Sequence, residues 1–180
     1  MIYLFDEDIK IAHIGESKKT SHDDSEYHKN LENGNIDKAK QVGEAIAVDT
    51  VSSAALEWNE ETDTSFEIQL QRGLLLAFSV VVAIESAALP TVIEDVIKQK
   101  FFSSLQKLDS GMYKETAESG AFSFYYLAYR RGTELERRVG QTFAMLCAHD
   151  GDPIYQELGE TLFCWMKSKT EKLLAESGIM

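Results

Sequence analysis

From residue 35 to the end of the chain, hydrophobic residues recur at steps of three and four. Val42, Ala45 and Ile46 begin such a series, and this spacing is typical of an α-helix with one apolar face. Polar and glycine-containing breaks divide the pattern into helices predicted at 35–59, 65–89, 92–109, 112–131, 134–149 and from 153 onward. Because the links are short, neighbouring helices should be antiparallel. We therefore predict an all-α antiparallel bundle of five or six helices.

Residues that commonly start and stop helices occur at these breaks. A threonine followed three residues later by a glutamate forms a capping box, in which each side chain bonds a backbone N–H near the other residue. Such pairs are Thr64 with Glu67, Thr91 with Glu94 and Thr133 with Glu136. Gly111 and Gly132 are predicted C-terminal caps, and Asp152 before Pro153 is a predicted helix start.

The first 34 residues follow a different pattern. Apolar residues 2–5 precede the acidic "DED", and Ile9, Ile11 and Ile14 then fall largely in alternation, which predicts a short β-hairpin or extended pair. A polar, turn-rich stretch follows, with room for one short helix. Two strands alone are marginal in water, so this segment should lie on a helix or pair with another chain. We divide the chain into an acidic N-terminal segment, residues 1–34, and a helical domain, residues 35–180.

The most apolar stretch, "LLLAFSVVVAIESAALP" at 74–90, could be a membrane span or a core helix. Arg72 and Glu85 enclose only 12 uncharged residues, whereas a span needs about 20. We therefore predict a core helix and no membrane span.

Glu85 is the one charge in that stretch, and it falls on the side shared with Phe78, Val81 and Val82. A carboxylate on an apolar face is costly unless it is paired, protonated or close to water. Three interpretations follow: Glu85 reaches water near the helix end, it pairs with a buried base or hydroxyl, or it belongs to a functional pocket.

The net charge of −12 is unevenly distributed. Residues 1–63 hold 15 acids against 6 bases, and residues 64–180 hold 15 acids against 12 bases. Such an acidic surface repels nucleic acid and attracts a basic protein patch, so we expect no nucleic-acid binding. The N-terminus has acids where a secretory signal would have bases, and Cys147 and Cys164 lie in apolar helical contexts. Both observations favour a cytoplasmic protein with reduced core thiols.

A search for catalytic and metal-binding patterns gives no strong candidate. No histidine has a glutamate three residues before it, as a helical di-iron site would need. The chain also has no Gly-x-Ser-x-Gly elbow and no glycine-rich phosphate loop. Glu-x-x-Glu pairs at 57/60, 115/118 and 157/160 are interpreted as solvated helix faces. We predict no catalytic residues, no metal and no cofactor.

One segment combines tyrosines with arginines against the acidic background. They are Tyr125, Tyr126, Tyr129, Arg130, Arg131, Arg137 and Arg138. Arginines at a helix end satisfy free carbonyls, and Arg137 and Arg138 can pair with Glu134. The same residue types are enriched at protein interfaces, so the segment is also a candidate binding patch for a protein or an acidic ligand.

These observations favour a non-enzymatic, cytoplasmic binding protein that acts through protein–protein contact, such as an inhibitor, immunity protein, adaptor or complex subunit. Its partner would carry a basic patch, or it would be a second copy in a homodimer. The alternative is a small-molecule binder or carboxylate-dependent enzyme with an inter-helix pocket, using Glu85 with Asp49 or Glu57 and an arginine of residues 130–138.

Overall fold

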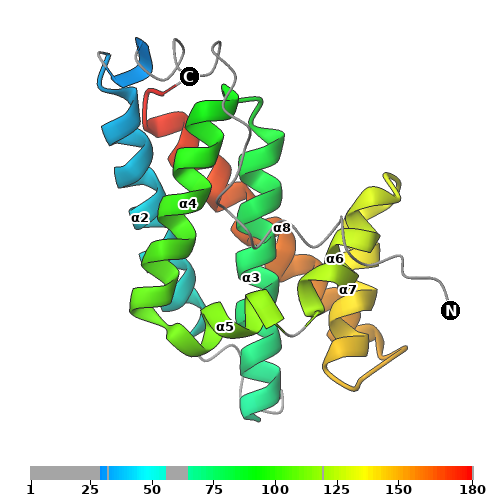
Figure 1. Ribbon diagram of the computed structural model, residues 1–180. Helices are drawn as coiled ribbons and strands as arrows, with labels where there is room; N and C mark the ends of the chain where they lie inside the picture. Colours follow the sequence, from blue (N-terminus) through cyan, green and yellow to red (C-terminus); the bar gives the residue numbers. More distant parts are fainter. Residues whose placement is uncertain (1–28, 32, 56–64, 119, 180) are drawn as a thin grey trace, which may run out of the picture.

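The computed structural model of the chain describes residues 29–31, 33–55, 65–118 and 120–179 (Figure 1). From residue 35 onward these residues form seven helices, and they contain no β-strand. The helices are α2 (Asn35–Ala54), α3 (Phe66–Ser86), α4 (Thr91–Leu108), α5 (Ser110–Glu118), α6 (Ala121–Arg130), α7 (Leu135–Leu146) and α8 (Pro153–Glu176). The predicted all-α class is confirmed for this part of the chain. The predicted N-terminal hairpin lies outside the described residues.

The helix predicted at 112–131 is in fact two helices, α5 and α6, and this division accounts for the helix beyond the predicted number. Gly120 precedes α6 with φ of +71°, a left-handed conformation that favours glycine. The boundary between α4 and α5 is also earlier than predicted. Asp109, and not Gly111, separates them, and its Oδ1 accepts a hydrogen bond from the backbone N–H of Met112 at 2.9 Å.

Helix α3 runs through the middle of the molecule (Figure 1), and every residue from Gly73 to Ile84 is buried. By length and composition alone α3 could cross a membrane, but 72% of its apolar window is buried within the protein. The ring of Phe78 stacks on that of Tyr125 at 5.3 Å and contacts Phe122 and Phe163. As predicted, the apolar stretch is a core helix.

Three glycines allow helices to approach closely. A Cβ atom on Gly43 would lie 2.7 Å from the Ile97 carbonyl oxygen, so α2 and α4 could not pack as they do with a larger residue. On α7 and α8, Gly140 and Gly159 play the same role at both sides of one contact. These three glycines therefore serve helix packing.

The capping boxes predicted at Thr91 and Thr133 are wrong. Thr91 is the first residue of α4, it follows Pro90, and no side chain caps this helix. Helix α7 follows Glu134, whose φ is +50°, and Thr133 Oγ1 instead accepts a hydrogen bond from Arg138 at 3.0 Å. In both cases the N-cap residue is a neighbour of the threonine, Pro90 for α4 and Glu134 for α7.

Two other helix starts have side-chain caps. The predicted box at Thr64 falls outside the described residues, and the cap of α3 is its neighbour Ser65, whose Oγ accepts from the Ile68 N–H. Asp152 caps α8 as predicted, since its Oδ1 accepts from the Ile154 N–H at 2.9 Å. Short polar side chains at these positions satisfy backbone donors that the first helical turn leaves unpaired.

Candidate functional site

Tyr125, one of the predicted binding residues, lies in the protein core. Its side chain has no exposed surface, and its hydroxyl has no hydrogen-bond partner among the described residues. Burial raises the pKa of this hydroxyl well above its usual value, because ionisation inside the core would be costly. Tyr125 therefore supports α6 from within, and in this structure its buried side chain does not belong to the exposed part of the predicted binding patch.

The other tyrosine–arginine contacts on α6 lie nearer the surface. Tyr126 and Tyr129 are half-buried, with ring centroids 5.9 Å apart. The guanidinium of Arg130 lies 5.8 Å from the Tyr126 ring centroid, within the range of a cation–π contact. Arg130 is itself exposed at the end of α6, so its side chain is oriented by the tyrosine while it faces solvent.

The remaining arginines follow α6 and begin α7. Arg131 is exposed and caps the C-terminal end of α6. Arg137 pairs with Glu134 at 3.5 Å, as predicted, on an exposed surface. Arg138 donates instead to Thr133 and is half-buried. The structure thus brings Arg130 and Arg131 to the end of one helix, and Arg137 and Arg138 to the start of the next.

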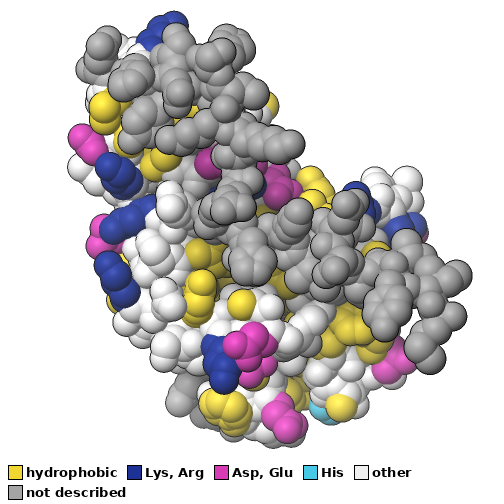
Figure 2. Space-filling model, in the orientation of Figure 1, with side chains coloured by type: hydrophobic (Ala, Val, Ile, Leu, Met, Phe, Trp, Pro, Cys, Tyr) yellow, Lys and Arg dark blue, Asp and Glu magenta, His cyan; other side chains and the backbone are white. Residues whose placement is uncertain are grey.

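Two residues that the sequence analysis did not single out complete this surface. Phe124 and Leu127 lie one turn apart on α6 and are 49% and 57% exposed. Figure 2 shows basic side chains where α6 passes into α7.

The exposure of two apolar residues on α6 could have been predicted from the sequence, because α6 has more apolar residues than one helical face can hold. Ala121, Tyr125 and Ala128 fill the core-facing side, which leaves Phe124 and Leu127 outside.

Phe124, Leu127, Arg130 and Arg131 together are named the α6 surface. Phe124 and Leu127 point away from the core, because the opposite side of α6 packs against α3 through the stacked rings of Tyr125 and Phe78. Large apolar side chains that protrude beside arginine are the residue types found at protein-binding hot spots. The arrangement offers contact area and positive charge.

Glu85 forms part of a separate polar cluster near the end of α3. Its Oε1 lies 3.6 Å from Lys98 Nζ on α4, and the same ammonium group lies 2.6 Å from Glu94. The Glu85 side chain is 21% exposed. The structure therefore supports two of the three interpretations of Glu85 at once. Its carboxylate pairs with a base, and it also reaches the surface.

Burial and charge act on this cluster in opposite directions. Burial raises the pKa of Glu85, and the charge of Lys98 partly offsets that effect. For Lys98, burial alone would lower the pKa, but the hydrogen bond and charge of Glu94, together with Glu85, raise it. Burial and the charge of Glu85 both raise the pKa of Tyr126 on α6. The cluster thus joins α3 to α4 and extends electrostatically to α6.

The carboxylates proposed to act with Glu85 in an enzyme do not join it among the described residues. Asp49 on α2 pairs with Lys169 on α8 at 2.6 Å, and this lysine in turn lies 4.9 Å from the Trp165 ring centroid. Glu57 lies outside the described residues. The interaction seen for Asp49 thus ties α2 to α8 and involves neither Glu85 nor its lysine.

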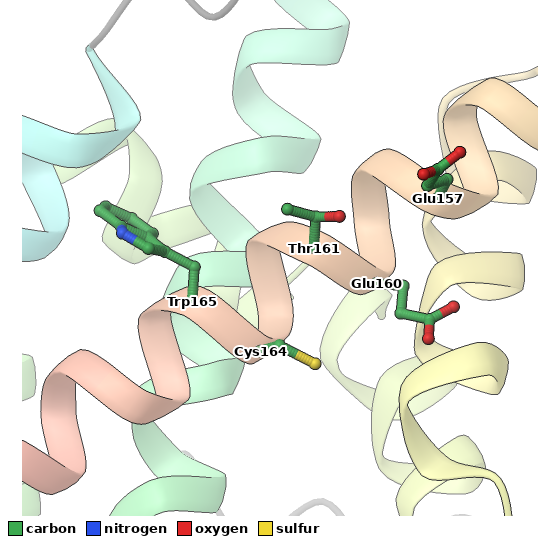
Figure 3. A pocket seen from close by; sticks show the side chains of 5 residues that line it. All are labelled: Glu157, Glu160, Thr161, Cys164 and Trp165. Atoms are coloured by element: carbon green, nitrogen blue, oxygen red, sulfur yellow. The ribbon is translucent and has the colours of Figure 1, made fainter.

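A shallow groove of about 750 Å³ runs along α8 (Figure 3). It is lined by Glu157, Glu160, Thr161, Cys164 and Trp165. Cys164 is exposed, so the prediction of two core thiols is right for Cys147 and wrong for Cys164. Burial raises the pKa of Cys147 to about 12, and partial burial with the charges of Glu136 and Glu160 raises that of Cys164. Neither thiol is therefore an activated nucleophile at neutral pH.

The segment "HDGDP" is accounted for by local structure. The His149 ring stacks on Tyr155 at 3.7 Å, and its Nδ1 lies 4.0 Å from Asp152, which caps α8. Among the residues described, no group of three or more histidine, cysteine, aspartate or glutamate side chains could hold a metal ion.

Comparison with known proteins found no matching family model, no matching curated protein and no matching solved structure.

Proposed function

We propose that this chain is a non-enzymatic binding protein of the cytoplasm that acts through protein–protein contact. The observation that carries the proposal is the exposure of Phe124 and Leu127 beside Arg130 and Arg131 on one short helix. Exposed apolar side chains are common singly, but a pair on one turn next to arginines resembles the centre of an interface. The proposed partner is a protein or a second copy of this chain.

The uneven charge adds a second proposed contact region. Residues 1–63 carry a net charge of −9 and would steer a basic surface of a partner toward this part of the chain. In this proposal the α6 surface provides the short-range contact, and the acidic third of the sequence raises the rate of encounter.

A photo-crosslinking residue placed at Leu127 in the full-length chain tests the proposal in the protein's own host. The matched control is the same residue at Ile154, which is 65% exposed at the start of α8. We expect a discrete crosslinked protein, or a crosslinked dimer of this chain, at Leu127 and not at Ile154. Equal crosslinking at both positions, or none at Leu127, would contradict the proposal.

Native mass spectrometry of untagged, gently purified protein tests it independently. A copurifying protein or a homo-oligomer would support the binding function. A bound small molecule or a stoichiometric metal would overturn it in favour of the alternative ligand-binding function, for which replacement of Glu85 by Gln is the next step.

A further inference from the structure

We propose that Asn33 is a site of spontaneous deamidation, at which the folded protein gains a negative charge as it ages. Asn33 is followed by Gly34, and this is the one Asn–Gly pair in the sequence. The reaction requires no partner, so it goes beyond the proposed binding function. Three features carry the proposal: the exposure of the Asn33 side chain, the backbone of the turn that contains it, and the contrast with two neighbouring asparagines.

The reaction needs only the protein and water. The backbone nitrogen of Gly34 loses its proton to base and attacks the side-chain carbon Cγ of Asn33. A new bond between this nitrogen and Cγ closes a succinimide ring, the bond from Cγ to Nδ2 breaks, and Nδ2 leaves as ammonia. Water then adds to either carbonyl carbon of the ring and breaks its bond to the nitrogen, which gives aspartate or isoaspartate at position 33. One water is consumed, one ammonia is released, and nothing is oxidised or reduced.

Asn33 lies in the turn that leads into α2, and both reacting groups are accessible there. The Asn33 side chain is exposed, and its amide has no hydrogen bond to another described residue. Gly34 has φ of +72°, a left-handed conformation that favours glycine, and a Cβ atom at this position would meet nothing within 4 Å. Since glycine has no side chain to shield its backbone nitrogen, this nitrogen is open to attack on Cγ.

A backbone hydrogen bond of the turn restrains the attacking nitrogen. The Gly34 N–H donates to the Leu31 carbonyl oxygen at 3.1 Å, and this bond must open before the nitrogen can react. The net stability of one such bond slows a reaction that requires its opening by at most about tenfold. The turn therefore retards the deamidation of Asn33 without preventing it.

Two neighbouring asparagines lack these features. Asn35 is the first residue of α2 and is half-buried, and its Nδ2 donates to Oδ1 of Asn30 at 3.2 Å. The residue after Asn35 is Ile36, a buried β-branched residue whose side chain crowds the backbone nitrogen. Asn30 is held by the same hydrogen bond and is followed by Leu31. The structure therefore predicts that Asn33 deamidates well before Asn30 and Asn35.

The two products should affect α2 differently. Gly34 is the N-cap residue of α2, and no side-chain hydrogen bond from a described residue caps this helix. Aspartate at position 33 would place a carboxylate near the free N–H groups of the first turn, which should maintain or raise thermal stability. Isoaspartate carries the backbone through its side-chain carbon and should disturb the turn. Thermal unfolding of Asn33→Asp measures the first effect, and a lower unfolding temperature than that of the wild type would contradict it.

Incubation of the full-length protein in mildly alkaline buffer tests the proposal. Samples are kept for days to weeks, either folded or in urea, and are then digested with trypsin. Cleavage after Lys29 and Lys38 releases residues 30–38, so one peptide contains all three asparagines. Tandem mass spectrometry locates the mass gain of deamidation, and synthetic peptides distinguish aspartate from isoaspartate. A sample digested without incubation gives the background formed during digestion.

We expect deamidation of the folded protein at Asn33, with a rate within about tenfold of the rate in urea. Gly34→Ala should reduce this rate to that of Asn30, because the added Cβ shields the attacking nitrogen. Gly132→Ala is the matched control, since Gly132 has φ of +74° and an equally open Cβ position in a different part of the chain. This variant has similar backbone strain and should leave the rate at Asn33 unchanged.

Several outcomes would overturn the proposal. They are deamidation of the folded protein at Asn30 or Asn35 as fast as at Asn33, and no gain at Asn33 above the digestion background. A rate in the folded protein more than about tenfold below the rate in urea would show that the turn protects Asn33. An unchanged rate in Gly34→Ala, or an equal loss in Gly132→Ala, would show that the backbone nitrogen of Gly34 is not the attacking group. The comparison of the three asparagines in the wild-type peptide holds even if Gly34→Ala impairs folding.

Discussion

Helices α3 and α6 are both rich in apolar residues, but they use them differently. From Gly73 to Ile84 every residue of α3 is buried, because other helices cover it on all sides. Helix α6 buries Tyr125 and Ala128, yet Phe124 and Leu127 on its other side face solvent. Apolar content thus tells how strongly a helix favours burial, and only the number of neighbouring helices tells whether burial is complete. The difference is what makes α6, and not α3, a candidate interface.

Truncation of a phenylalanine in each helix is the strongest test of this comparison. Phe78→Ala should lower the free energy of unfolding by about 3–5 kcal/mol, because it leaves a cavity beside Tyr125 and Phe163. Phe124→Ala should change it by less than about 0.5 kcal/mol, since this ring is half exposed. Urea unfolding measures both variants. Similar losses would show that Phe124 is packed in solution and that the α6 surface is not free.

Hydrogen exchange compares the two helices in the unmodified protein. Amides of residues 75–83 should exchange only on global unfolding, whereas amides of residues 124–130 should exchange through local opening with a free energy lower by about a few kcal/mol. The physical reason is that α6 is a 10-residue helix with one face in solvent. Equal amide protection of α3 and α6 in the isolated protein would contradict the expected difference in local stability. Increased amide protection of α6 on binding a partner would support its assignment as an interface.

Replacement of glycine by alanine should change the free energy of unfolding in opposite directions at Gly73, which lies inside α3, and at Gly120, which precedes α6. Gly73→Ala should leave stability unchanged or raise it by up to about 1 kcal/mol, because glycine weakens a helix interior. The new Cβ would lie 3.2 Å from Met112 Sδ, the far end of a flexible side chain that can move. Gly120→Ala, at φ of +71° before α6, should lower stability by about 1 kcal/mol. Thermal unfolding distinguishes them, and losses in both variants would show that Met112 cannot shift.

The smallest expected effect concerns Glu85 and depends on pH. Its raised pKa means that the folded protein still holds this proton at pH values where the unfolded chain has lost it. The contribution of Glu85 to the stability of the wild-type protein therefore falls as pH rises from about 4.5 through the raised pKa. Glu85→Gln removes the charge, so its stability relative to wild type should increase over that window, by less than about 1 kcal/mol for a partly exposed group.

Glu94→Gln is the matched control, because Glu94 makes the closer contact with Lys98, at 2.6 Å. This variant should lose stability at neutral pH, because the ammonium group of Lys98 loses its closest carboxylate. If Glu85→Gln is also destabilised at the pH values where its stability should increase, the ion pair with Lys98 outweighs the cost of burying the carboxylate.

Much of the fold could be predicted from the chain, and the errors have local causes. The periodicity located the helices because apolar side chains must share a face to reach a core. The boundary at Gly120 was missed because a single glycine can also lie inside a helix, and a left-handed turn depends on one backbone conformation. The boxes predicted at Thr91 and Thr133 failed for a similar reason, since the N-cap position of each helix is one residue away from the threonine and no side chain caps either helix.

The candidate site was predicted only in part. Composition and spacing are enough to show which residue types gather near 124–138 and that Glu85 interrupts an apolar helix. The packing of the helices was needed to show that Tyr125 faces the core, that Phe124 and Leu127 face solvent, and that Lys98 is the partner of Glu85. A helix has several faces of similar polarity, and which face is covered depends on neighbours that are distant in the chain. The period of a helix can be read from its own residues, whereas its exposure is a property of the whole molecule.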